Sequence, residues 1–98
     1  MPDMDAAHRF FFRTPRLKSQ LKQNKHDLGF ADQAEFDRAW NAIAAHINYR
    51  QPLPDESKAD YTKLATNTVL DILDIATYEI QAIAIAKLTS ELVKAIWD

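Results

Sequence analysis

The C-terminal part of the chain, from Asp55 to Asp98, contains neither glycine nor proline. The whole 98-residue chain has a single glycine, Gly29, where an average composition would give about seven. Glycine supplies the left-handed turns, bulges and phosphate-binding loops of β and α/β proteins. A chain so poor in glycine is therefore expected to be helical throughout.

The length of this segment constrains its arrangement. An unbroken helix over residues 55–98 would be about 65 Å long, at about 1.5 Å per residue. A compact domain of this size has a radius of gyration of only about 13 Å. The segment must therefore fold back on itself, or leave the globule and pair with another chain.

The apolar face of this segment changes side near its middle. Up to about Ile80, one helical face holds Tyr61, Leu64, Ala65, Ile72, Ile75, Ala76 and Ile83. Farther on, the opposite side holds Ile85, Leu88, Leu92 and Ile96. A supercoil drifts by only about 20° per heptad, so it cannot produce this reversal. Either the helix breaks between about residues 77 and 82, or one straight helix buries opposite sides against different partners.

Two more helices are expected in the first half of the chain. Thr14 followed by Pro15 predicts a helix start, because hydroxyl side chains cap helices and proline is favoured in the first turn; this helix should end at Gly29. Asp32, with Glu35 three residues later, predicts a second helix to about residue 48. Its apolar stripe comprises Phe36, Trp40, Ile43 and Ile47, and Phe30 is placed to pack against Phe36.

These patterns predict an all-α protein, a small bundle of three to four helices with a long C-terminal helical segment. We expect an N-terminal basic and aromatic arm over residues 1–14 and a single helical domain over residues 15–98.

Several classes of chemistry lack the residues they need. The chain has no cysteine, which excludes disulfides, thiolate catalysis and cysteine-ligated zinc. It also lacks a P-loop, a dinucleotide-binding fingerprint and an HExxH motif. Asp71 and Asp74 share the spacing of helical metal ligands but lack a Glu-x-x-His partner, and His46 flanks an apolar stripe. We expect no catalytic residue, no metal and no cofactor.

No stretch of the sequence has the character of a membrane span. The most apolar window, residues 69–88, carries three acidic residues, Asp71, Asp74 and Glu79, which would be costly within a bilayer. The apolar stretch near the start, residues 10–12, is too short for a signal peptide. We expect a cytoplasmic protein.

Charge is distributed unevenly along the chain. Residues 6–26 contain six basic residues and no acidic one, although the formal net charge of the whole chain is −2. Clustered cations beside aromatic side chains are typical of surfaces that bind an acidic partner. The predicted partner-binding residues are Arg9, Phe10, Phe12, Arg13, Arg16, Lys18, Lys22 and Lys25. A competing interpretation is that this segment docks on acidic residues of the same chain.

The function expected from these features is non-enzymatic. The chain is interpreted as a small helical binding or regulatory protein that acts through a protein partner, as a homodimer. The expected dimer interface consists of Ile85, Leu88, Leu92, Ile96 and Trp97. The alternative is a nucleic-acid-binding protein that uses the basic N-terminal third, residues 8–26, although the sequence pI of about 5.9 is low for such a protein.

Overall fold

The structure, a computed structural model, describes residues 6–50, 52–74 and 79–97. Within these ranges it is an all-α bundle with no strand, as the sequence predicts. One of its five helices has only four residues, so the main helices number four. The helices are α1 (Ala6–Gln23), α2 (Lys25–Leu28), α3 (Gln33–Tyr49), α4 (Lys58–Leu73) and α5 (Glu79–Trp97).

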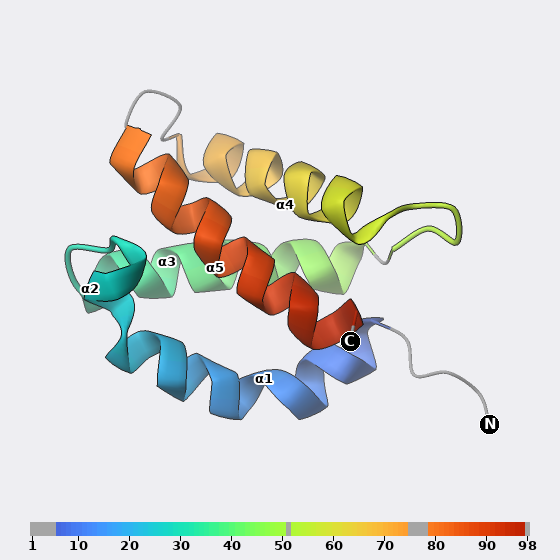
Figure 1. Ribbon diagram of the computed structural model, residues 1–98, viewed down its shortest axis with the longest axis horizontal. Helices are drawn as coiled ribbons and strands as arrows, with labels where there is room; N and C mark the ends of the chain where they lie inside the picture. The colour runs from blue at the N-terminus through green and yellow to red at the C-terminus, as the bar shows by residue number, and fades with distance from the viewer. Residues whose placement is uncertain (1–5, 51, 75–78, 98) are drawn as a thin grey trace.

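The four long helices alternate in direction, and α5 is the central element (Figure 1). It lies between α4 and α1 and crosses in front of α3, so that it packs against all three. The longest dimension of the molecule is 42 Å and its radius of gyration is 12.9 Å. The C-terminal segment therefore folds back on itself rather than extending as one helix.

Local caps close three helix ends, and the sequence predicts two of them, at Asp32 and Gly29. The Asp32 carboxylate accepts a hydrogen bond from the Glu35 backbone amide at 2.9 Å, and Phe30 packs edge-on against Phe36 at the same end of α3. The Ser57 hydroxyl accepts one from the Asp60 amide at 3.1 Å at the start of α4. Gly29 ends α2 with a φ of 112°, a left-handed conformation that glycine adopts without a steric penalty.

The predicted helix start at Thr14 and Pro15 is wrong, because α1 already begins at Ala6 and runs through Pro15. Proline inside a helix removes one backbone hydrogen bond and disfavours the helical turn before it. Tertiary packing outweighs this cost here: Thr14 and Leu21 are both buried on the face of α1 that meets the rest of the bundle. The described part of the predicted arm, residues 6–14, is therefore the first half of α1.

The C-terminal segment breaks slightly earlier than predicted. α4 ends at Leu73, and Asp74 adopts a left-handed conformation with a φ of 54°. α5 starts at Glu79, while residues 75–78, which include part of the predicted break, lie outside the described residues. A new helix with its own phase explains the reversal of the apolar face, so the alternative of one straight helix is wrong.

The earlier break also changes which face of α4 is buried. Tyr61 and Ala65 are buried as expected, together with Val69, whereas Leu64 and Ile72, also expected on the buried face, are exposed. The expected face includes residues on both sides of Asp74, which belong to two different helices. Ile83, which belongs to α5, is exposed for the same reason.

The stripe of α3 is buried as predicted, with Trp40 near its centre. The Trp40 ring stacks on Phe36 at a centroid distance of 6.0 Å, and Lys18 of α1 lies over it at 5.6 Å. Trp40→Ala should lower the free energy of unfolding by roughly 3–5 kcal/mol, because it leaves a large cavity in the core.

Denaturant unfolding of the purified protein measures this loss. Asn41→Ala, on the exposed side of the same helix, is the matched control and should change stability little. An unchanged transition for Trp40→Ala would show that this indole is not part of the core.

Candidate functional site

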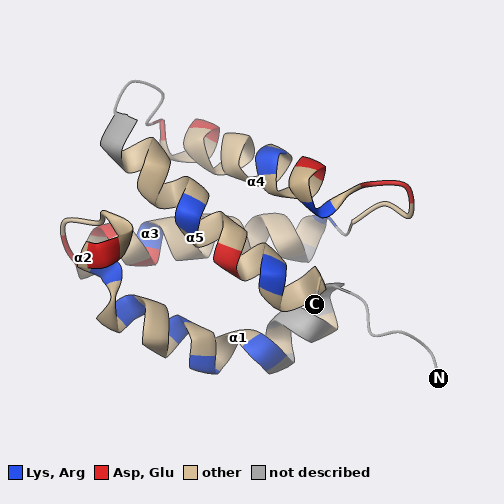
Figure 2. Cartoon of the chain, viewed as in Figure 1, with Lys and Arg blue, Asp and Glu red and all other residues tan. Residues whose placement is uncertain are grey.

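Three basic side chains line an open groove between α1 and α5, with a volume of about 480 Å³. α1 carries basic side chains and no acidic ones, and α5 brings both kinds alongside it (Figure 2). The groove is lined by Arg13, Arg16, Leu17 and Gln20 of α1 and by Glu91, Lys94 and Ala95 of α5. Three cations and one carboxylate therefore surround a small apolar floor.

The three cations of this basic groove differ in how they are held. Arg13 donates from Nη1 to the carbonyl oxygen of Ala95 at 3.2 Å, so it satisfies a carbonyl in the last turn of α5. Lys94 lies 3.5 Å from Glu91, one turn earlier on α5, in an exposed pair that contributes little to stability. Arg16 is exposed and makes no ion pair with any residue in the described ranges. Arg16 is thus available to a partner, and Lys94 becomes available once it leaves its weak, exposed pair with Glu91.

Two other predicted partner-binding residues lie on the opposite flank of α1, against α3. Lys18 sits over the Trp40 ring, and Lys22 lies 3.6 Å from Asp37. Side chains three or four residues apart share one side of a helix, as Arg13, Arg16 and Gln20 do, whereas Lys18 and Lys22 each lie two residues from Gln20 and fall on the other flank. The structure therefore separates the predicted set of cations. Of these two lysines, only Lys22 lies beside an acidic residue of the same chain, and that residue is Asp37 rather than Asp71 or Asp74.

The remaining predicted partner-binding residues are not part of this groove. Lys25 lies on α2 and is half-buried. Arg9, Phe10 and Phe12 belong to α1, but their side chains lie outside those that the structure describes.

The residues predicted for a dimer interface are placed inside the single chain. Four of them, Ile85, Leu88, Leu92 and Ile96, are fully buried in the core, and Trp97 is half-buried against it. The apolar face of α5 that these residues form is covered by α1, α3 and α4 of the same chain. The dimer stays a prediction without support from these residues.

A second cluster of polar and aromatic groups joins α3 to α4. Arg50 and Glu56 form a two-pronged ion pair with distances of 2.7 and 3.1 Å. The Tyr61 hydroxyl donates to the carbonyl oxygen of Arg50 at 2.8 Å, and its ring lies 5.6 Å from both His46 and Trp97. This cluster ties the connection between α3 and α4 to the end of α5.

The pKa values in this cluster are shifted by burial and by the ion pair between Arg50 and Glu56. Burial raises the pKa of Tyr61 to about 12, so its phenol stays protonated. Burial, followed by the positive charge of Arg50, lowers the pKa of His46. The hydrogen bond from Arg50 lowers the pKa of Glu56. His46 is buried, and its Nε2 has no hydrogen-bond partner among the described residues.

The remaining features considered in the sequence are a metal site and a membrane span. Asp71 and Asp74 are exposed at the end of α4. In the ranges that the structure describes, no three His, Asp or Glu side chains come together as a metal site would need. In those same ranges, no helix combines the length and apolar character needed to cross a membrane.

Comparisons with protein-family models, with curated proteins and with solved structures give no significant match.

The buried histidine makes stability depend on pH. The unfolded chain takes up a proton on His46 near its ordinary pKa of 6.5, and the folded chain does so only at lower pH. The stabilisation from the neutral ring is complete above pH 6.5, and it is lost as the pH falls from there through the folded-state pKa. Denaturant unfolding at a series of pH values should show this decline beginning below pH 6.5.

His46→Phe keeps an aromatic ring beside Tyr61 but cannot titrate, so its stability should stay level over the first part of this decline. The stabilisation from the Glu56 carboxylate is lost only at lower pH, as the pH falls below the ordinary pKa of 4.5. The same slope in both proteins just below pH 6.5 would contradict this role for His46.

Proposed function

We propose that the protein is a non-enzymatic binding protein that docks an acidic segment of another protein in the basic groove between α1 and α5. The observation that carries the proposal is the pairing of two cations, Arg16 and Lys94, across the apolar floor formed by Leu17 and Ala95. An acidic segment with apolar residues would match both features. A regulatory role, by occupying a surface on the partner, is consistent with this mode of binding.

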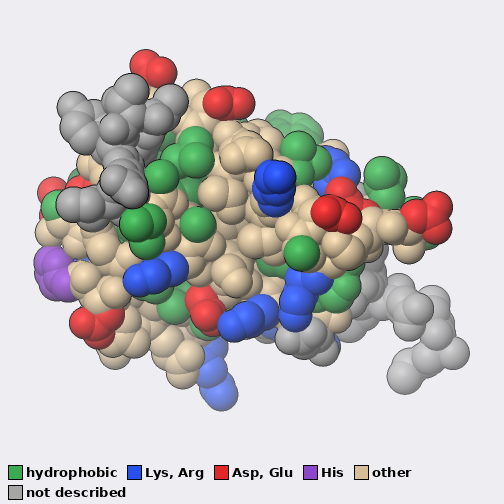
Figure 3. Space-filling view, turned by 45° about the horizontal axis from the view of Figure 1, so that its top comes forward, with side chains coloured by type: hydrophobic (Ala, Val, Ile, Leu, Met, Phe, Trp, Pro, Cys, Tyr) green, Lys and Arg blue, Asp and Glu red, His purple; other side chains and the backbone are tan. Residues whose placement is uncertain are grey.

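The composition of the groove suits a protein more than a nucleic acid. Interfaces between proteins are enriched in arginine and combine an apolar centre with a charged rim. Nonspecific nucleic-acid binding needs a run of cations that follows the phosphates. Lys18 and Lys22 are engaged with α3, so the six basic residues of the N-terminal third do not form one such run. In the space-filling view, basic side chains on the face shown also surround an acidic one (Figure 3).

The test uses a labelled acidic peptide in which glutamates alternate with leucines at helical spacing, and fluorescence anisotropy measures its affinity. The double variant Arg16→Glu with Lys94→Glu should weaken binding at least tenfold, because it replaces both cations with anions. Arg13 is left unchanged, since it also caps α5. The control variant, Lys58→Glu with Lys63→Glu on α4, changes the net charge equally and should bind as the unaltered protein does.

The outcomes separate the two functional classes. Affinity should fall with added salt but retain a component that resists it, because apolar contact is not screened. Equal weakening in the test and control variants would show that only net charge matters. Tighter binding of a DNA duplex than of the peptide, with a steep salt dependence, would replace this proposal by the nucleic-acid alternative.

A further inference from the structure

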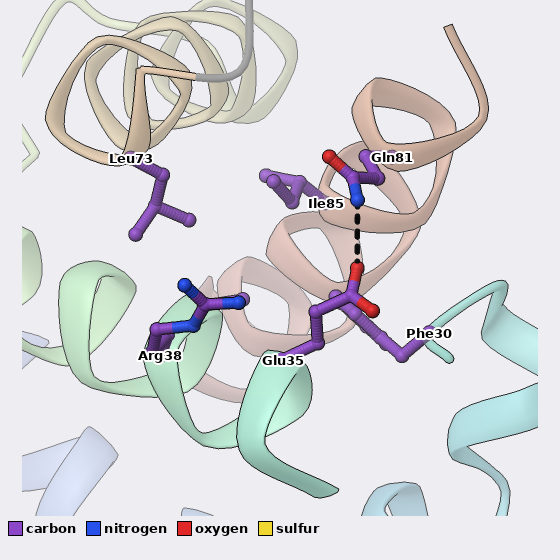
Figure 4. Close-up of a pocket in the computed structure, with 7 residues that line it drawn as sticks. Phe30, Glu35, Arg38, Leu73, Gln81 and Ile85 are labelled. Atoms are coloured by element: carbon purple, nitrogen blue, oxygen red, sulfur yellow. Dashed lines mark hydrogen bonds between the residues drawn. The ribbon is translucent and has the colours of Figure 1, made fainter. Parts of the chain in front are cut away.

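A second hollow lies at the other end of α5, where four parts of the chain meet. The loop before α3, α3 itself, the end of α4 and the start of α5 enclose a pocket of about 130 Å³ (Figure 4). Its apolar walls are formed by Phe30, Ala39, Leu73 and Ile85. Its polar groups are Glu35, Arg38 and Gln81. None of these residues lines the basic groove.

The apolar walls belong to the core and have fixed positions. Phe30, Ala39 and Ile85 are almost fully buried, and Leu73 packs against the same core cluster. Phe30 is held edge-on against Phe36 at a centroid distance of 5.7 Å. An apolar ligand is favoured in a pocket with such walls, because binding removes apolar surface of both the ligand and the pocket from water.

Glu35 is held in place at the rim by two donors. Its Oε1 accepts a hydrogen bond from Nε2 of Gln81 at 3.0 Å, across the pocket from α5, and its Oε2 accepts one from the Ala31 amide at 3.2 Å. Both donors, together with the positive end of the α3 dipole, stabilise the carboxylate. Glu35 is therefore not free to turn towards another cation.

Arg38 stands on the next turn of α3, and its guanidinium points into the space between Glu35, Leu73 and Ile85 (Figure 4). It makes no hydrogen bond or ion pair with any residue in ranges 6–50, 52–74 and 79–97. A guanidinium is weakly hydrated and presents paired N–H donors that match a carboxylate. The pocket thus combines apolar walls with one cation whose donors are unused.

We propose that this pocket binds a small carboxylic acid with a compact apolar body. The carboxylate would receive two hydrogen bonds from Arg38, and the apolar body would lie against Ala39 and Ile85. An apolar cavity of about 150 Å³ holds a molecule the size of benzene, so the pocket of about 130 Å³ suits an apolar body of at most about six non-hydrogen atoms, with the carboxylate outside it at Arg38. Two sources share this chemistry, an aromatic acid and a branched aliphatic acid.

The test is a titration of the 15N-labelled full chain followed by two-dimensional NMR. Benzoate represents the aromatic source and isovalerate the branched aliphatic source. Tighter binding of one of them identifies the source. The backbone amides of Ala39, Leu73 and Ile85 should shift with a common, saturating dependence on ligand concentration. Benzamide has the same size and no charge, and it should bind at least tenfold more weakly than benzoate.

Two variants locate the binding. Arg38→Gln should weaken benzoate binding at least tenfold and leave the spectrum away from the pocket unchanged, because Arg38 is exposed and outside the core. Arg16→Gln removes an exposed arginine of the basic groove and should leave benzoate binding unaltered. This control also makes failure here distinguishable from failure of the proposed docking function.

Three results would overturn the proposal. Benzamide could bind as tightly as benzoate, which would leave Arg38 without a role. Arg38→Gln could retain full affinity. The third result is that neither acid shifts the amide signals of the pocket residues, or that the shifted signals belong to Leu17 and Ala95, which would place the carboxylate in the basic groove.

Discussion

The architecture depends on the end of α4 at Asp74. This residue adopts a left-handed conformation, with a φ of 54°, and its amide donates to carbonyls of the preceding turn at Leu70 and Asp71. Aspartate tolerates this conformation better than most residues. Because α4 stops there, α5 can return antiparallel to it and bury a broad face against three other helices. Had the helix continued, the apolar residues after Ile80 would have faced away from the buried side of α4.

The features that sequence predicted well are those governed by short-range contacts. Asp32 and Gly29 each act on backbone groups within a few residues, so their roles are readable from local spacing. The stripe of α3 repeats without interruption and is buried as expected. The helix start at Pro15 failed because Thr14 and Leu21 pack against distant parts of the chain, and such packing overrides a local signal.

The candidate site was only partly within reach of the sequence. Arg13 and Arg16 were expected at a partner surface, and both line the basic groove. Lys94 was not expected there, since its place beside α1 depends on how α5 packs, which no local pattern encodes. The contact of Lys18 with Trp40 was not predicted from the sequence either. Helical spacing does place Lys18 and Arg16 on different sides of α1, but only once α1 is known to be continuous.

The positions of the groove and the pocket also bear on stability. Ile85, at the pocket, and Ala95, at the groove, are separated by ten residues of one helix, or about 15 Å. Substitutions at such a distance without shared partners usually have additive effects. The charged side chains proposed to bind, Arg16, Lys94 and Arg38, are exposed, whereas the apolar contacts proposed at Ala39 and Ile85 belong to the core as well. Arg13 differs, since its hydrogen bond to Ala95 makes it both a groove residue and a cap of α5. A small all-α domain can therefore accommodate the two proposed sites, provided that the cations facing a ligand are distinct from those that hold the helices.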